Sequence, residues 1–294
     1  MPTTPSIAYE DRAGLRRMLD DAAAILARAG VGTPRLDAEL LVAAAAGADR
    51  ARLYAGGVAL DAAARARLAE TVELRARRMP LAYILGRREF YSLELEVAPG
   101  VLIPRPETET LVALALDELA ARPAARVLDL GCGSGAIAIA LAANAPHARI
   151  VAADISDDAL EIAARNAARL GFAPRLEFVR TDCFAPLDGA GALGRFDLIV
   201  ANPPYIAAAE IAGLAPEVRD FEPRIALAGG ADGRDFYRRI ASGCDAHMTP
   251  AADVIVEVGA GQAAPVAEIF RATGRAEITI ARDLAGLERV VRAR

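Results

Sequence analysis

Apolar residues that recur every three or four positions predict helices at the start of the chain. Leu15, Leu19, Ala22 and Leu26 share one helical face. Thr33-Pro34 opens a second helix, and a third runs from about residue 61 to 74. Residues 1–82 are therefore expected to form a small all-α domain, which serves either as a protein-docking module or as plain scaffold.

The pattern changes between residues 83 and 104. Residues 89–97 partly alternate between apolar and polar, Pro99-Gly100 is a turn signal, and Val101-Leu102-Ile103 is apolar again. This segment is expected to form a β-hairpin that links two domains.

From about residue 105 onward, short apolar runs alternate with helical stretches such as 159–170 and 235–244. This alternation is typical of an α/β domain with a doubly wound, mainly parallel sheet, here over residues 105–294. The runs predict seven strands, at residues 126–130, 150–154, 176–181, 197–201, 253–258, 277–281 and 288–291.

Composition narrows the classes of protein to consider. The net charge is −5 and the sequence pI is about 5.3, which argues against a broad surface for nucleic-acid phosphates. The three cysteines show neither metal nor disulfide spacing. The chain shows no secretion signal at its start and no apolar run near the ~18 residues of a membrane span. We expect a cytoplasmic monomer without metal, membrane or direct nucleic-acid partner.

A glycine-rich turn, Gly131-Cys132-Gly133-Ser134-Gly135, joins a strand to an apolar helix. Glycines let such a turn bend tightly and let a ligand approach the backbone, and the helix N-terminus adds partial positive charge. The dinucleotide fingerprint tolerates alanine at its last position, so this spacing alone does not exclude NAD. Asp129 favours S-adenosylmethionine (SAM), because a carboxylate suits the ammonium group of SAM and disfavours a pyrophosphate.

Two further acidic residues follow the next strands. Asp154 suits the two hydroxyls of a ribose, unless it only caps the following helix. Asp182 suits an adenine amino group, with Cys183 and Phe184 beside the ring, unless it is a simple turn residue. Because the carboxyl ends of parallel strands lie at one edge of a sheet, these residues together predict a SAM pocket.

Asn202-Pro203-Pro204-Tyr205 directly follows a predicted strand. The prolines fix φ and carry no N–H, and a residue before proline is held extended. The segment therefore offers rigid carbonyl acceptors, an amide and an aromatic ring, which together suit a planar –NH2 group. The simpler interpretation is a strand followed by a Pro-Pro turn.

These motifs give the sequence a clear likeness over nearly its whole length: it resembles the peptide chain release factor N5-glutamine methyltransferases. The resemblance implies a helical N-terminal domain, a hairpin linker and a Rossmann-like class I SAM-dependent methyltransferase domain. It also implies methylation of the glutamine in the Gly-Gly-Gln motif of class 1 release factors, which act in translation termination. The shared motifs are LAYILG at 81–86, EFYS at 89–92, LIPRPETE at 102–109, LDLGCGSG at 128–135, NPPYI at 202–206, FEP at 221–223 and ERV at 288–290.

The resemblance also assigns residues. It places the substrate glutamine on Asn202, Pro203, Pro204 and Tyr205, with Asn202, Pro203 and Tyr205 in catalysis. Phe90 is a candidate contact with the release factor because it lies between the two expected domains. Relatives often carry an aromatic residue where this chain has Cys183, which leaves the packing on adenine to Cys183 or Phe184. The resemblance places cofactor contacts at Gly131, Gly133, Ser134, Gly135, Asp154, Asp182 and Cys183. We add Asp129, Cys132 and Asn202 to complete the expected set of cofactor-binding residues.

Three alternatives remain open at this point. A sister family methylates a glutamine of a ribosomal protein, but it usually has Pro-Arg-Ser-Pro where this chain has Pro-Arg-Pro-Glu at 104–107. An amino-group methyltransferase of DNA or RNA bases needs the same acceptors and also a basic groove, which the acidic pI disfavours. A SAM-binding regulator without catalysis would have no use for the Asn-Pro-Pro-Tyr segment.

Overall fold

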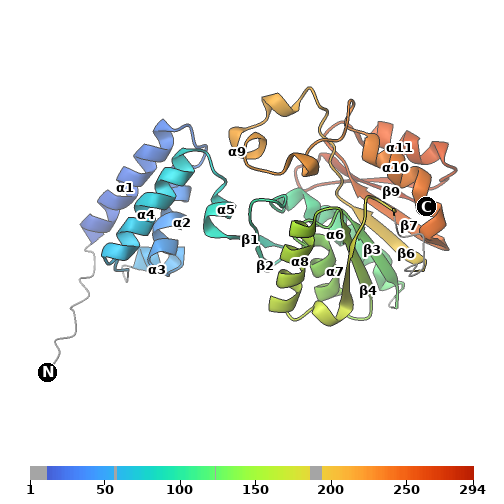
Figure 1. Ribbon diagram of the computed structural model, residues 1–294, viewed down its shortest axis with the longest axis horizontal. Coiled ribbons are helices and arrows are strands. Elements are labelled where there is room, and N and C mark those ends of the chain that lie inside the picture. The colour runs from blue at the N-terminus through green and yellow to red at the C-terminus, as the bar shows by residue number, and fades with distance from the viewer. Residues whose placement is uncertain (1–11, 56–57, 123, 186–193) are drawn as a thin grey trace. The chain divides into compact units, whose positions relative to one another are not determined.

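The computed structural model describes residues 12–55, 58–122, 124–185 and 194–294. The chain divides into two compact units (Figure 1). The smaller unit contains residues 1–86 together with 216–221, and the larger contains 87–215 and 222–294. The predicted linker is therefore not a separate segment, because the hairpin belongs to the larger unit. A short piece of the later sequence belongs to the smaller unit.

The smaller unit is all-α, as predicted. Helices α1, α2 and α4 contact one another and enclose a core that includes Leu26, Leu41 and Leu53. Helix α4 begins after Asp61, whose side chain accepts a hydrogen bond from the Ala64 N–H. Two short helices were not expected, because a helix of five or six residues shows no period. The helices are α1 (Arg12–Arg28), α2 (Pro34–Ala45), α3 (Arg50–Ala55), α4 (Ala62–Ala76), α5 (Leu81–Leu85) and α9 (Pro216–Arg219).

An ion-pair cluster explains why α9 belongs to this unit. Buried Arg75 of α4 donates to Asp37 of α2 at 2.7 Å and to Glu217 of α9 at 3.1 Å. Arg78 adds two hydrogen bonds to Glu217, at 2.7 and 2.6 Å. Burial opposes ionisation of Glu217, but hydrogen bonds from Arg78 and Arg75 outweigh it and lower its pKa. The charged partners satisfy one another, so that removing one would leave a buried charge unpaired.

The larger unit opens with an antiparallel hairpin of β1 (Arg87–Phe90) and β2 (Leu93–Glu96). Pro99-Gly100 is a turn, as predicted, but it follows the hairpin and does not join its strands. The chain turns at Tyr91 and Ser92, which have φ of 51° and 61°, and residues 101–103 form no strand. Glycine or asparagine normally fills such left-handed positions, so no turn signal is present at Tyr91-Ser92. Side chains support the turn instead, because Glu109 accepts from the Tyr91 N–H and Glu89 accepts from the Ser92 N–H.

A seven-stranded sheet forms the centre of the larger unit, in the order β5-β4-β3-β6-β7-β9-β8. Strands β3 to β7 pair in parallel, and β9 pairs antiparallel with β7 and β8. All seven predicted strands are present. Their bounds are β3 (Arg126–Leu130), β4 (Arg149–Asp154), β5 (Leu176–Arg180), β6 (Phe196–Ala201), β7 (Met248–Glu257), β8 (Ile278–Arg282) and β9 (Glu288–Ala293).

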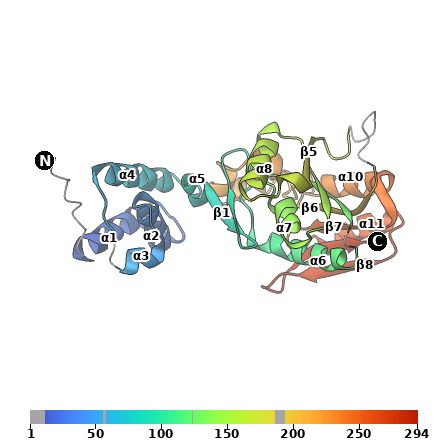
Figure 2. The ribbon, with the colours of Figure 1, turned by 90° about the horizontal axis from the view of Figure 1, so that it is seen from below.

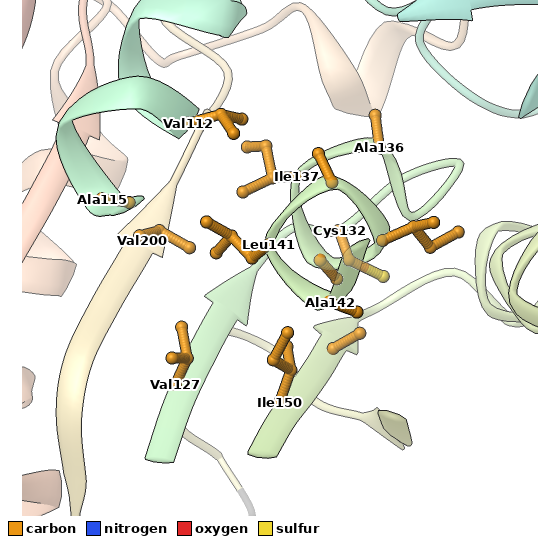
Figure 3. Packing of buried hydrophobic residues seen from close by; sticks show 14 of the residues in the cluster. Val112, Ala115, Val127, Cys132, Ala136, Ile137, Leu141, Ala142, Ile150 and Val200 are labelled. Atoms are coloured by element: carbon orange, nitrogen blue, oxygen red, sulfur yellow. The ribbon is translucent and has the colours of Figure 1, made fainter. Parts of the chain in front are cut away.

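Helices cover both faces of the sheet (Figure 2). On one face Val127, Ile150 and Val200 of the strands pack with Ile137 and Leu141 of α7 (Figure 3). Alternate strand residues point to the other face, where α10 and α11 pack, as the two-residue period of a strand requires. The helices are α6 (Glu109–Ala120), α7 (Ala136–Asn144), α8 (Asp157–Arg169), α10 (Asp235–Gly243) and α11 (Ala263–Ala272). Short 3-10 turns are η1 (Pro106–Thr108), η2 (Ala173–Arg175), η3 (Ile211–Gly213), η4 (Arg224–Ala226) and η5 (Cys244–His247).

The strand order fixes where a ligand can bind. The chain runs from β3 outward to β4 and β5, and then returns to the other side of β3 with β6 and β7. The connections therefore diverge between β3 and β6 and open a crevice at their carboxyl ends. No helix in the described part of the chain is long and apolar enough to cross a membrane.

Candidate active site

A pocket with a cavity of about 130 Å³ lies at this crevice and opens to solvent. This is the place where open α/β sheets bind their ligands. Predicted site residues in the lining of the pocket are Gly131, Gly133, Asp154, Asp182, Cys183, Asn202, Pro203 and Pro204. The lining also contains apolar residues that the sequence reasoning missed, among them Val101, Leu102, Ile155, Ile225, Phe236 and Ile240.

The glycine-rich turn is held by the neighbouring strand. The N–H groups of Gly131 and Cys132 both donate to the Ala153 carbonyl of β4, at 2.8 and 3.0 Å. The Gly133 N–H donates to Asp154 Oδ2 at 2.9 Å. These bonds fix the turn before any ligand arrives.

The three glycines of the turn have different surroundings. Gly131, Gly133 and Gly135 have φ of 74°, 54° and 81°. A Cβ added to Gly131 or Gly133 would meet no atom within 4 Å, whereas one on Gly135 would lie 3.0 Å from Ile139 and 3.1 Å from Ala163. The first two glycines therefore leave open space beside the pocket, and the third permits close packing of α7 against α8.

Asp129 is fully buried below the turn. Its Oδ2 accepts from the Ala138 N–H in the first turn of α7 at 3.1 Å, and its Oδ1 has no hydrogen-bond partner among the described residues. Burial raises the pKa of Asp129 to about 7. A dinucleotide would need free N–H groups here for its pyrophosphate, so their use by Asp129 and Asp154 disfavours NAD. Asp129 is not in the described lining, and its contact with a ligand ammonium stays a prediction.

Asp154 lines the pocket, and each of its carboxylate oxygens accepts a hydrogen bond from a backbone N–H. Besides Gly133, it accepts from the Ser156 N–H at 3.0 Å. The cap of α8 is Ser156, whose hydroxyl accepts from the Ala159 N–H. The alternative that Asp154 only caps this helix is therefore wrong.

The segment after β5 brings two predicted residues, Asp182 and Cys183, into the pocket and places a third, Phe184, outside it. Cys183 lines the pocket with a φ of 60°, and burial raises its pKa to about 11. Phe184 is buried and stacks on His247 at 4.8 Å between ring centroids, so its expected place beside the ligand is wrong. Phe236 of α10 supplies the aromatic ring of the lining instead. Asp182 lines the pocket and forms an ion pair with Arg239 at 2.6 Å.

Four of the predicted residues, three from the glycine-rich turn and Phe90, do not line the pocket. Cys132, Ser134 and Gly135 are outside its described lining, and the Ser134 carbonyl accepts from buried Asn166 at 3.0 Å. Phe90 is only 1% exposed and packs in the core of the larger unit. The expectation that Phe90 contacts a protein substrate is therefore wrong, because no surface of its ring is accessible.

Asn202, Pro203 and Pro204 form one wall of the pocket at the end of β6. The Asn202 Nδ2 donates to Thr108 Oγ1 at 3.1 Å. The Tyr205 carbonyl accepts from Gln262 Nε2 at 2.9 Å, which anchors the far end of the segment. The tetrapeptide is thus fixed at both ends.

The Tyr205 ring is not in the described lining of the pocket. It packs against the buried core on the face of the sheet that α10 and α11 cover. Burial raises the pKa of Tyr205 to about 12. The phenol therefore stays protonated at neutral pH.

Buried Glu222 joins two walls of the pocket, a role that the sequence reasoning missed. It accepts hydrogen bonds from the Arg105 guanidinium and, at 3.4 Å, from the Ile103 N–H. The segments around these residues supply Val101 and Leu102 on one side and Ile225 on the other. Burial raises the Glu222 pKa, and its hydrogen bonds and the Arg105 charge oppose that effect.

Comparisons with known proteins agree with this arrangement. The family model "Methyltransferase small domain" matches residues 107–216, and "PrmC N-terminal domain" matches residues 17–86. A release factor glutamine methyltransferase of Geobacter sulfurreducens is 44% identical over 95% of this chain and 96% of its own. The chain belongs to the release factor glutamine methyltransferase family. A relative of the same name from Cereibacter sphaeroides is 45% identical over 92% of this chain and 94% of its own.

Among solved structures, the hMettl16 catalytic domain in complex with an RNA hairpin is similar, with a TM-score of 0.57. The match covers 76% of this chain and 81% of that one at 17% identity, which supports the methyltransferase fold alone. The predicted fold class is confirmed. The residues that match the PrmC N-terminal domain model, 17–86, lie within the smaller, helical unit.

Proposed function

We propose that this protein transfers a methyl group from SAM to the side-chain nitrogen N5 of the glutamine in the Gly-Gly-Gln motif of class 1 release factors. The observation that carries the proposal is the position of Asn202, Pro203 and Pro204 in the wall of the pocket at the carboxyl ends of β3 and β4. The names of relatives at 44–45% identity supply the substrate.

The pocket residues fit SAM. Asp154 has two backbone-oriented carboxylate oxygens that can accept hydrogen bonds from ribose hydroxyls. Asp182 can accept from an adenine amino group, and Ile155 and Phe236 offer apolar surface to a ring. Gly131 and Gly133 leave space for close approach to the backbone. When bound, SAM supplies an electrophilic methyl group on a sulfonium.

The chain contributes the orientation of the nucleophile. An amide nitrogen reacts poorly because its lone pair is delocalised into the carbonyl. Asn202 Oδ1 and the Pro203 carbonyl would accept the two amide hydrogens of the glutamine, which aims the nitrogen and favours pyramidalisation. As the N–C bond forms and the C–S bond breaks, positive charge develops on nitrogen and both acceptors bind more strongly. The nitrogen then releases one proton to solvent.

The other parts of the chain have supporting roles in this proposal. The rigid proline segment holds the acceptors without offering competing N–H donors. Tyr205 is a neutral phenol whose ring packs against the core outside the pocket lining, and it would help to hold this wall in place. We assign the smaller helical unit to docking of the release factor, and we place the reaction in the cytoplasm, where translation terminates.

Mass spectrometry tests the proposal. A class 1 release factor is incubated with SAM and the protein, and the peptide containing Gly-Gly-Gln is analysed. We expect one added methyl group on the glutamine with the wild type. Asn202→Ala should retain binding of S-adenosylhomocysteine (SAH) and lose turnover by about 100-fold or more.

Asn144→Ala is a matched control, because Asn144 makes one local hydrogen bond to Ala140 on α7. It should methylate like the wild type. Near-normal turnover by Asn202→Ala would contradict the role of Asn202, and methylation of nucleic acid or a ribosomal protein instead would contradict the substrate.

A further inference from the structure

Asn202 has two buried polar neighbours that come from different parts of the chain. Thr108 is in η1 and is 4% exposed, and Glu257 ends β7 and is 2% exposed. Asn202 Nδ2 donates to Thr108 Oγ1 at 3.1 Å. The Glu257 carboxyl group lies near enough to both side chains for them to lower its pKa, and its Oε2 has no hydrogen-bond partner among the described residues. Thr108 and Glu257 are outside the described lining of the pocket, whereas Asn202 is part of it.

The direction of these hydrogen bonds decides which end of the Asn202 amide can serve a substrate. An ionised carboxylate only accepts hydrogen bonds, so an ionised Glu257 would accept one from the Thr108 hydroxyl. The Thr108 oxygen must then accept from Asn202, which uses Nδ2. The Asn202 Oδ1 is left for the pocket, where the proposed reaction needs an acceptor.

We propose that Thr108 and Glu257 are positioning residues that hold the Asn202 amide with its oxygen toward the pocket. This inference rests on the proposed function, in which Asn202 Oδ1 accepts an amide hydrogen of the substrate. It also gives a reason for two separate motifs, because the threonine of Pro-Glu-Thr at 106–108 supports the asparagine of Asn-Pro-Pro-Tyr.

The arrangement makes the orientation of Asn202 depend on pH. A protonated Glu257 can donate to Thr108, which can then donate to Asn202 and favour the flipped amide, with Nδ2 toward the pocket. Burial raises the pKa of Glu257 to about 7, and its hydrogen bonds to Thr108 and Asn202 limit the rise. The charged or titratable groups near Glu257 are Arg289 of β9, Glu107 of η1, Tyr205 and Tyr237 of α10.

Of these neighbours, the two tyrosines do not titrate near neutral pH, because burial raises both pKa values above the usual range. Glu107 disfavours ionisation of Glu257 and Arg289 favours it. Glu257 is therefore the group of this cluster whose charge changes near pH 7.

Steady-state kinetics of the full-length protein with release factor test the inference. Thr108→Val keeps the shape of the side chain and removes the hydroxyl, and Glu257→Leu removes the terminal acceptor. Each should lower kcat by about 10- to 100-fold, by analogy with residues that orient metal ligands. SAH affinity, measured by calorimetry, should stay close to that of the wild type.

Thr108→Ser retains the hydroxyl and should restore most of kcat, which a role in packing alone would not predict. Glu257→Gln cannot ionise, so the part of the fall in kcat below about pH 7 that depends on Glu257 should disappear, and any part that depends on Asp129 should remain. The inference is overturned if Thr108→Val keeps wild-type kcat, or if Glu257→Gln keeps the acid limb of the wild type unchanged.

A measurement without methyl transfer separates this inference from the proposed function. Carbon-13 NMR of glutamate-labelled protein with SAH should show one carboxyl resonance that titrates near pH 7 and is absent in Glu257→Gln. The Asn202 side-chain amide resonances should shift over the same pH range. If these signals appear and no release factor is methylated, only the proposed substrate fails; if Asn202 does not respond, the positioning inference fails.

Discussion

Two glycines of the β3–α7 turn, Gly133 and Gly135, should affect different properties of the protein when each is replaced by alanine. Gly135→Ala places a methyl group 3.0 Å from Ile139 and 3.1 Å from Ala163, at a φ of 81°. Gly133→Ala places its methyl group in open space beside the pocket, at a φ of 54°. The first change should therefore reduce stability, and the second should mainly reduce cofactor binding.

The expected magnitudes follow from these surroundings. A left-handed backbone costs an L-residue about 1–2 kcal/mol, and crowding of a packed helix interface costs about 1–3 kcal/mol more. Gly135→Ala should therefore lower the free energy of unfolding of the larger unit by about 2–5 kcal/mol. Gly133→Ala pays only the backbone cost, about 1–2 kcal/mol, but should weaken SAH binding at least tenfold, about 1.4 kcal/mol.

Urea unfolding followed by circular dichroism gives the stability of each variant, and calorimetry with SAH gives the affinity. Both are measured on the same preparations of the full-length protein. If Gly135→Ala unfolds like the wild type, the close packing of α7 on α8 is refuted. If Gly133→Ala binds SAH normally, the turn does not face the cofactor.

Two further predictions concern buried polar groups. Asn166→Leu leaves the Glu96 N–H and carbonyl and the Ser134 carbonyl without partners, so urea unfolding should show a loss of about 3–5 kcal/mol. Asn144→Leu, which loses one hydrogen bond, should lower the free energy of unfolding by less than about 1.5 kcal/mol. Equal losses in the two variants would contradict the link between stability and the number of hydrogen bonds lost. The raised pKa of Glu257 means that its contribution to stability is present at low pH and is lost as the pH rises from its usual 4.5 through about 7. Glu257→Gln should therefore gain up to about 3 kcal/mol relative to the wild type between about pH 5 and pH 8, and a difference that is constant with pH would refute this.

The sequence predicted the sheet well, because each buried strand is a short apolar run followed by a turn signal. It also placed Asp154 and Asn202 correctly at strand ends, since strand-helix alternation determines which ends share an edge. It failed at the hairpin turn of Tyr91 and Ser92, where the carboxylates of Glu109 and Glu89 provide support that glycine normally makes unnecessary.

The failures at the site have a common cause. Phe90 and Phe184 were expected at a ligand or partner surface because of residue type, but tertiary packing buries both. Phe236 and Glu222 come from segments far along the chain. The FEP motif at 221–223 contains Glu222, but no local pattern shows that either residue reaches the pocket. The hydrogen bond between Asn202 and Thr108 could not be predicted from the sequence, because the two segments meet only through the strand order of the sheet.

A structure of the protein with SAH and a Gly-Gly-Gln peptide tests most directly how the substrate amide is held. We predict that the glutamine side-chain nitrogen lies between the SAH sulfur and the Asn202–Pro203 wall, with its two hydrogens directed at Asn202 Oδ1 and the Pro203 carbonyl. A sulfur that faces away from this wall, or lies too far from the nitrogen for one methyl group to bridge the gap, would contradict the account.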